Sequence, residues 1–301
     1  MGILPVRFFE QAESLFHQDE CPGGKEAAML IAGSGTFYAG GCSPHEGFIL
    51  FKAHDPDNWA KLAGYPVKVD PQGHVRLRLE GIDTLEINFQ GYHQPLKFVN
   101  EALDFLLSSL GIRSVLWGSA HSRDGAAGWI LSHKAEKRGR PVALAFTGDQ
   151  GWPDGSEINP DAALLKHSVS YQLLQAGLAY PTYYQGLPPH LREAFTRVWR
   201  EAGIHRRGFR PLDRTNLGVE VDGLRSLTEK DVILPKLFRR LVRFMKEKHD
   251  LSGFQAWLEA NPDHVTYLPT GRVTTLDTLV RVEGNSVKLD AAPEDLVFAE
   301  N

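Results

Sequence analysis

The chain has 301 residues, of which 42% are hydrophobic and 23% are charged. This composition is too apolar for an intrinsically disordered protein, and the length suggests about two domains. Because 33 Lys and Arg stand against 37 Asp and Glu, the net charge is −4. A histone-like polycation is thereby excluded, and any contact with a polyanion must be local.

No apolar run reaches the roughly 18 residues of a membrane-spanning helix, so we expect no membrane partner. The first twenty residues are acidic from Glu10 onward and lack the basic start and apolar stretch of a secretory signal. Two cysteines, Cys21 and Cys42, are too few for a disulfide framework or for a zinc site made of cysteine alone. We therefore expect a cytoplasmic protein.

Residues 1–46 are predicted to form an N-terminal extension. Apolar residues at helical spacing within 6–17 predict a short amphipathic helix there. The stretch GSGTFYAGG at 33–41 matches neither the dinucleotide-binding nor the Walker phosphate-loop pattern. Its glycines instead favour a turn-rich connector or a hairpin.

From residue 47 the pattern is typical of strands. Strand signals lie in the segments GFILFKAHD, YPVKVD, HVRLRLEGI and TLEINF. A helix is predicted at 97–110, ended by Gly111, and two further strands at SVLWG and PVALAFTG. Helices are also predicted at 161–177 and 188–202.

The last part of the chain predicts a basic amphipathic helix at 228–248, a shorter helix at 252–260 and two or three terminal strands. Strands first and helices interleaved later indicate a small barrel with helices packed against it. We therefore expect an α+β fold with a small barrel domain at 47–212 and a C-terminal α+β extension at 213–301.

Four short motifs carry candidate chemistry. They are the turn Asp55-Pro56-Asp57, the segment from Arg78 to Asp83-Thr84-Leu85-Glu86, the basic turn Glu136-Lys137-Arg138-Gly139-Arg140, and the helix end Gln175-Ala176-Gly177-Leu178-Ala179 before Tyr183 and Tyr184. Taken singly, each has an ordinary structural interpretation, such as a turn, a solvated arginine or a basic loop. Their combination and order are more specific.

In this order the motifs resemble those of the staphylococcal nuclease family. That family has a Lys-Ala-x-Asp-Gly-Asp-Thr turn, an Arg followed after four residues by Asp-Thr-Pro-Glu, and a basic turn ending in Gly-Arg. The resemblance covers about residues 47–207 and implies a five-stranded OB-type barrel and a metal-dependent nuclease. This chain departs from the family pattern at Pro56, Asn58 and Leu85. It also has Arg138 where the family's basic turn has Tyr, and Ser170 where the family's late helix has Asn.

Hydrolysis of a phosphodiester needs positive charge around the phosphorus and an activated water. The resemblance implies a calcium ion held by Asp57, Asp83 and the backbone oxygen of Thr84, with Asp55 acting through water or shaping the turn. Glu86 would orient or deprotonate the attacking water. Arg78 and Arg140 would flank the scissile phosphate. Further substrate contacts are expected from Lys137, Arg138, Tyr183 and Tyr184.

Residues 190–248 hold fifteen Lys and Arg against eight Asp and Glu, an excess that suits a phosphate backbone. Arg206 and Arg207 form the densest part of it. The leading hypothesis is a calcium-dependent nuclease that acts on DNA, RNA or both and prefers single strands. A catalytically silent barrel that binds nucleic acid or protein is the alternative. A third possibility is an unrelated enzyme whose chemistry lies in the flanking regions.

Overall fold

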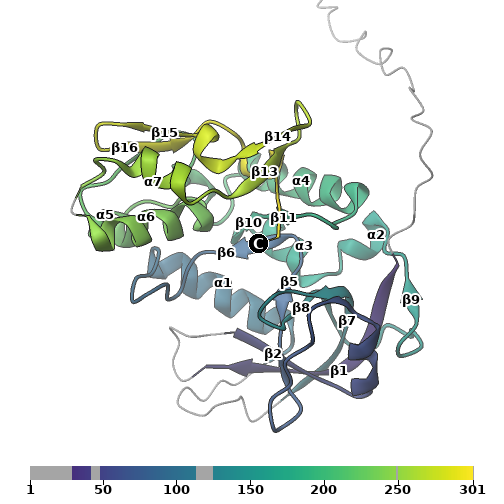
Figure 1. Cartoon of the computed structure of the whole chain (residues 1–301). Helices are drawn as coiled ribbons and strands as arrows, with labels where there is room; N and C mark the ends of the chain where they lie inside the picture. Colours follow the sequence, from purple (N-terminus) through teal and green to yellow (C-terminus); the bar gives the residue numbers. More distant parts are fainter. Residues whose placement is uncertain (1–28, 42–47, 113–124, 249, 301) are drawn as a thin grey trace, which may run out of the picture.

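The computed structural model describes residues 29–41, 48–112, 125–248 and 250–300. The helix expected at 6–17, the strand expected at SVLWG and both cysteines lie outside these ranges. The fold mixes helices with a nearly closed, barrel-like sheet (Figure 1). No helix in the described ranges is long and apolar enough to cross a membrane.

The barrel follows the strand order β4-β2-β1-β7-β8-β5. Its long strands are β1 (Leu30–Gly40), β2 (Phe48–Ala53), β7 (Ala126–Ala135) and β8 (Pro141–Thr147). The outer strands β4 (Val75–Arg76) and β5 (Arg78–Leu79) are successive parts of one extended segment. Because β4 pairs with β2 and β5 pairs with β8, this segment nearly closes the barrel. Two short strands, β3 (Ala63–Gly64) and β9 (Glu157–Ile158), pair with β7 and β1.

The prediction of a connector or hairpin at 33–41 was wrong, because most of that stretch belongs to the central strand β1. The glycines serve close packing inside the barrel. A Cβ atom on Gly35 would lie 2.3 Å from the carbonyl oxygen of Lys52 and 2.5 Å from the ring of Phe51. Gly35 also faces Gly128 across the β1–β7 pair. Glycine in a strand often marks such a close approach of side chain or backbone.

Two predicted strands are largely missing. YPVKVD contributes only an isolated bridge at Val69, since Pro66 removes a donor and the Asp70 carboxylate accepts from the backbone N–H of Gln72 and His74. TLEINF contributes only its first residue, at the end of β6 (Ile82–Thr84), and an isolated bridge of Phe89 with Tyr92. The chain then turns, and β6 pairs with β10 (Ala179–Pro181).

The helices follow the sequence pattern more closely. The expected helix at 97–110 is α1 (Leu96–Ser109), and that at 188–202 is α4 (Pro189–Ile204). The helix expected at 161–177 is divided into α2 (Ala162–Leu165) and α3 (Val169–Gln175), because the Ser168 hydroxyl caps a new helix by accepting from the Tyr171 N–H at 3.2 Å.

The basic helix expected at 228–248 begins later, as α6 (Pro235–Glu247), after the short α5 (Leu224–Glu229). Proline at the first helical position explains this start, because it lacks the N–H that a helix leaves unpaired there. The expected helix at 252–260 is α7 (Phe254–Ala260).

The C-terminal strands form two small sheets. The first has the order β11-β17-β13-β14, and the second has the order β12-β16-β15. Their bounds are β11 (Tyr183–Tyr184), β12 (Val219–Glu220), β13 (His264–Tyr267), β14 (Arg272–Thr275), β15 (Val280–Glu283), β16 (Ser286–Leu289) and β17 (Leu296–Phe298).

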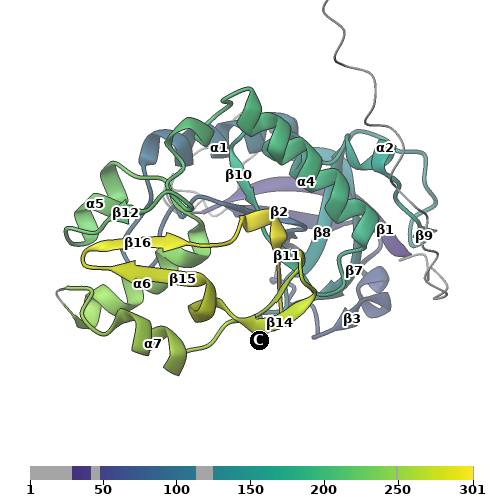
Figure 2. The ribbon, with the colours of Figure 1, turned by 90° about the horizontal axis from the view of Figure 1, so that it is seen from above.

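One continuous cluster of buried residues runs from the barrel interior, for example Phe51, to Phe298 in β17. The helices α1 and α4 lie on the side of the barrel that faces the C-terminal elements (Figures 1 and 2). On α6, Leu237, Phe238, Leu241 and Val242 are buried. The opposite face of α6 carries charged side chains, and this face contacts the turn that follows β6.

Candidate polyanion-binding surface

A single arginine of α6 bridges Asp83 and Glu86, two of the acidic residues of the second sequence motif. The Arg239 Nη2 lies 2.8 Å from the Asp83 Oδ2, and its Nη1 donates to the Glu86 Oε1. The three side chains are between 17% and 27% exposed, so the pairing is largely but not fully withdrawn from water. The planar guanidinium suits this role because it presents two donors side by side.

The local backbone fixes this arrangement from both directions. Asp83 lies opposite Tyr180 in the β6–β10 pair. The Glu86 N–H donates to the side chain of the fully buried Gln94 at 3.0 Å, and the Gln94 amide donates in turn to the Ile233 carbonyl at 2.7 Å. Gln94 therefore ties the Glu86 turn to the segment that leads into α6.

The electrostatics are dominated by burial and by Arg239. Burial raises the pKa of the Glu86 carboxyl, the charge of Asp83 adds to that effect, and Arg239 acts in the opposite direction. Burial alone would lower the pKa of Arg239, but the charges of Asp83 and Glu86 raise it above the ordinary value. The arginine thus stays charged and offsets the repulsion between two neighbouring carboxylates.

Arg78 lies near the same acidic pair. Its guanidinium carbon lies 4.0 Å from the centroid of the Tyr184 ring, a cation–π contact. Burial lowers the pKa of Arg78, but Tyr184 and then Asp83 outweigh burial and the pKa is raised. The structure therefore brings Arg78, Asp83, Glu86 and Tyr184 to one place.

The basic turn between β7 and β8 lies close to this group. Arg140 donates to the Glu136 carboxylate at 2.9 Å, and Lys137 and Arg138 are exposed. The positive charge of Arg138 lowers the pKa of Glu86, so the turn and the acidic pair interact. The pKa of Arg76 is lowered first by burial and then by the charges of Arg140 and Arg138.

The polar face of α6 continues this positive charge. Residues at helical spacing on it are Lys236, Arg239, Arg240, Arg243 and Lys246. The buried Asp263 accepts from Arg240 at 2.6 Å and lies 3.3 Å from the Lys236 ammonium. A small cavity of about 80 Å³ opens between Lys236, Arg239, Arg240 and Arg243.

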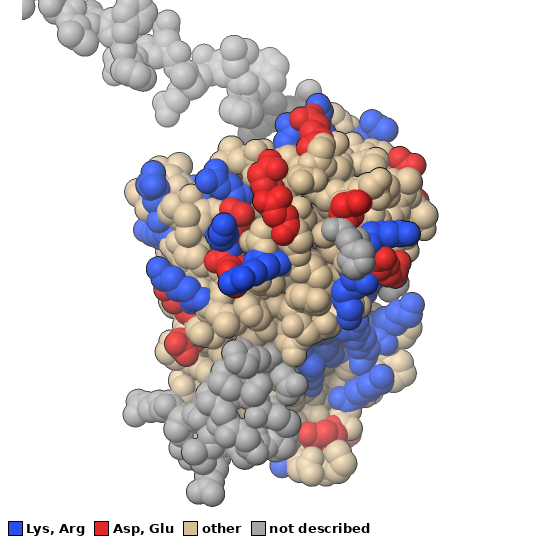
Figure 3. Space-filling model, turned by 90° about the vertical axis from the view of Figure 1, so that its left-hand side faces the viewer, with Lys and Arg blue, Asp and Glu red and all other residues tan. Residues whose placement is uncertain are grey.

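Arg243 stands apart from its neighbours because no ion pair to it is found within the described residues. Its pKa is lowered by burial, then by repulsion from Arg240 and Arg239, with a further contribution from Arg138. We name Arg76, Arg138, Arg140 and Arg243, together with Lys246, the basic surface. Figure 3 views the side of the molecule that carries α5 and α6, and Lys and Arg side chains gather in one part of that face.

The first acidic motif lies elsewhere. In the antiparallel pair of β2 and β4, Leu50 faces Arg76 and Phe51 faces Val75. The chain thus reaches Asp55 and Asp57 at the end of the pair where β4 begins, whereas Asp83 follows beyond the opposite end. Asp55 caps the short helix Pro56–Lys61 by accepting from the Asp57 N–H at 3.0 Å, and Asp57 is exposed. The topology therefore does not bring Asp57 to Asp83.

These positions do not fit a calcium cradle. Calcium takes six to eight oxygen ligands, mainly carboxylates and carbonyls. Here Asp83 and Glu86 are engaged by Arg239, Asp57 lies at the other end of the β2–β4 pair, and Thr84 pairs with Ala179 in the β6–β10 ladder. Within the residues that the structure describes, no three His, Cys, Asp or Glu side chains gather as a metal site.

The remaining sequence candidates have mainly structural surroundings. Tyr183 is fully buried, and its hydroxyl lies 2.9 Å from the Thr196 hydroxyl. Arg207 donates to the Gln175 carbonyl at 3.1 Å. Arg206 is exposed with a positive φ of 55° at the turn after α4. None of these three contacts the basic surface in the hydrogen bonds and ion pairs of the described residues.

Sequence reasoning missed Arg239, Arg243 and Asp263. The available signal was the alternation of cations and apolar residues along 236–246, which predicted a basic helix without indicating its partners. Comparison of the sequence with protein-family models and with curated proteins finds no match in either case.

Proposed function

We propose that this chain binds single-stranded nucleic acid through the phosphates of its backbone, on the basic surface. The observation that carries this proposal is that cationic side chains of the β7–β8 turn and of α6 gather on one surface. Burial is the first cause that lowers the pKa values of Arg76 and Arg243, and the charge of Arg138, on a barrel turn, lowers both of them further. Guanidinium groups that lie close together and repel one another are stabilised by an anion.

The basic surface holds several arginines from different elements, which favours a polymer of phosphates over a single small anion. A planar guanidinium matches phosphate oxygens and keeps its charge at any working pH. Aromatic rings lie beside the cations, as with Arg78 on Tyr184 and Arg243 at 5.5 Å from the Phe89 ring centroid. Cationic grooves with interleaved aromatic rings are typical of single-strand binding.

We further propose that the barrel is of the OB type. In chain order its long strands are β1, β2, the β4–β5 segment, β7 and β8, and their spatial order places the third beside the fifth. Barrels of that type commonly bind oligonucleotides. The strand order supports the proposal, and Arg239 offsets part of the negative charge of the two carboxylates that would otherwise repel a phosphate chain at this place.

The direct test is fluorescence anisotropy with a labelled single-stranded dodecamer at low salt. Arg138→Gln and Arg243→Gln should each weaken binding by about tenfold, the value of one charged hydrogen bond to phosphate. Lys166→Gln is the matched control, because Lys166 is exposed at the end of α2, on the opposite side of the molecule from α6 (Figures 1 and 2). Equal effects of all three variants would count against the basic surface.

Phosphodiester hydrolysis is the second candidate function, favoured by one observation. Arg78, Asp83 and Glu86 lie together, as a nuclease of the resembled family would need. We test it by incubating single- and double-stranded DNA and RNA with the chain and calcium, with and without a chelator. Cleavage that the chelator abolishes and that Glu86→Gln removes would support hydrolysis. Intact substrate in every lane would leave binding as the function.

A further inference from the structure

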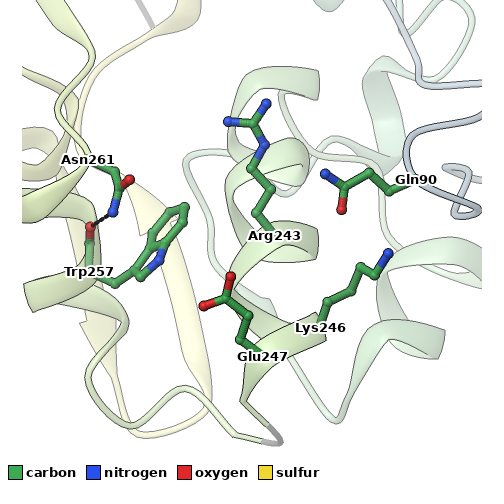
Figure 4. A pocket seen from close by; sticks show the side chains of 6 residues that line it. All are labelled: Gln90, Arg243, Lys246, Glu247, Trp257 and Asn261. Carbon is green, nitrogen blue, oxygen red and sulfur yellow. Dashed lines mark hydrogen bonds between the residues drawn. The ribbon is translucent and has the colours of Figure 1, made fainter.

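A second cavity lies near the C-terminal end of α6, beside Arg243 and Lys246. It has a volume of about 470 Å³ and is lined by residues of α6, of α7 and of the turn after β6 (Figure 4). These residues are Gln90, Arg243, Lys246, Glu247, Trp257 and Asn261. Arg243 also lines the small cavity beside Arg239, so the two spaces adjoin. A volume of this size suits a small organic ligand rather than an ion.

The two sides of this cavity differ chemically. On one side lies the indole of Trp257, backed by Phe254 at 6.2 Å between ring centroids and by Phe244 at 5.9 Å. Figure 4 shows the Glu247 carboxylate directed toward this aromatic side and the Lys246 side chain directed toward Gln90 on the other. An ionised carboxylate only accepts hydrogen bonds. On the aromatic side of the cavity, Glu247 therefore favours the N–H groups of a base and disfavours a phosphate.

The cationic side carries Arg243 and Lys246, and the carboxylate of Asp263, whose charge raises the pKa of Arg243, lies outside the cavity lining. Arg243 is repelled by its arginine neighbours, and the ion pairs found in the described ranges include neither Arg243 nor Lys246. This side therefore suits a phosphate. Arg243 and Lys246 lie on one face of α6 and would hold this phosphate beside the aromatic side of the cavity.

The backbone at Gln90 adds an independent observation. Phe89 and Tyr92 exchange backbone hydrogen bonds of 2.6 and 3.0 Å across a two-residue turn. Its central residues, Gln90 and Gly91, both have positive φ, at 55° and 89°, the pattern of a type I′ turn. A glutamine there costs about 1 kcal/mol or more relative to glycine. The turn carries this cost while placing an amide at the cavity wall.

We propose that this cavity is a nucleotide subsite, in which the base of one nucleotide stacks on Trp257 and its phosphate meets Arg243 and Lys246. The inference rests on the proposed function, and it names the place where the bound strand is read by stacking. The Glu247 carboxylate lies on the aromatic side, where a base edge would present its polar groups, whereas Gln90 lies with Lys246 on the phosphate side. Stacking on a ring accepts any base, so strong sequence preference is not expected.

The experiment compares a normal single-stranded dodecamer with a dodecamer of the same length made of abasic deoxyribose-phosphate units. Trp257→Leu keeps apolar packing against Phe244 and Phe254 but removes the ring, whereas Trp257→Phe keeps a ring. We expect Trp257→Leu to weaken binding of the normal strand by about 5- to 150-fold and to leave the abasic strand unchanged. Trp257→Phe should retain most of the affinity for the normal strand.

A loss by Trp257→Leu that is equal for the normal and abasic strands would overturn the subsite, as would an equal loss by Trp257→Leu and Trp257→Phe. Adenosine monophosphate distinguishes the two sources of this chemistry. If it binds the native chain but not Trp257→Leu, while normal and abasic strands bind alike, the cavity takes a free nucleotide and the strand assignment fails. Failure of both strands to bind the native chain would instead count against the proposed function.

Discussion

Replacing Arg239 by methionine tests the bridge to Asp83 and Glu86. The variant keeps much of the apolar stem but removes both charged hydrogen bonds and leaves two carboxylates without their common partner. Breaking a fully buried pair in this way costs about 3–5 kcal/mol. Because the three side chains are 17–27% exposed, we expect a loss of about 2–3 kcal/mol in the free energy of unfolding at pH 7.

The loss should depend on pH in a direction set by Glu86. Burial and Asp83 already raise the pKa of Glu86, and Arg239 opposes them. Without Arg239 the folded pKa rises further above the unfolded value of about 4.3, so the variant loses stability as pH rises through this interval. The deficit relative to the native chain should therefore be largest at pH 7 and smaller at pH 4.

Urea unfolding followed by tryptophan fluorescence at both pH values measures this effect. Arg239→Lys is the informative control, since it keeps the charge but cannot present two parallel donors, and it should recover only part of the lost stability. A deficit below about 0.5 kcal/mol at pH 7, the range of a surface substitution, would refute the inferred bridge. A deficit that grows at pH 4 would refute the assigned electrostatics.

Three further perturbations test other parts of the structure. Asp263→Asn should destabilise the chain by about 2–4 kcal/mol. The pKa of Asp263, which burial would raise, is lowered by Arg240 and Lys236, so the loss should be seen above pH 4 and disappear as pH falls below it, measured by urea unfolding. Burial and Lys134 lower the pKa of His133 in the folded chain to about 4. As pH falls below about 6.5, His133 is therefore protonated in the unfolded chain before it is protonated in the folded chain. Native stability should therefore drop by up to about 3 kcal/mol between pH 7 and pH 4 relative to a His133→Gln variant, and parallel curves would contradict the burial of this ring. Gly81→Ala combines a φ of +78° with a Cβ placed 2.4 Å from the ring of Phe195, so we expect a loss of about 2–4 kcal/mol in thermal or urea unfolding, and a loss under 1 kcal/mol would contradict that close approach.

The sequence predicted those parts of the site that local spacing determines. Arg78, Asp83 and Glu86 lie within nine residues, on an extended segment and the turn after it, so their proximity depends on little else. The polar and apolar alternation of 236–246 likewise predicted a basic helix, although its start depended on Pro235.

The long-range parts could not be read from local pattern. The position of Asp57 relative to Asp83 depends on strand order, and β1, which lies between β2 and β7, contains glycines that locally favour a turn. The partner of Asp83 and Glu86 lies more than 150 residues later in the chain. The pairing of Arg239 with these carboxylates depends on how α6 packs, which residue spacing in the sequence does not predict.

A salt titration of single-strand binding tests most directly whether the basic surface holds phosphates. If binding releases the counterions of three or four phosphates, log K should fall with log [NaCl] at a slope of about −2 to −3. Combining Arg138→Gln with Arg243→Gln should reduce that slope by about 1.4 while Lys166→Gln leaves it unchanged. A slope near zero, or one that the double variant shares with the native chain, would contradict a phosphate strand bound at this surface.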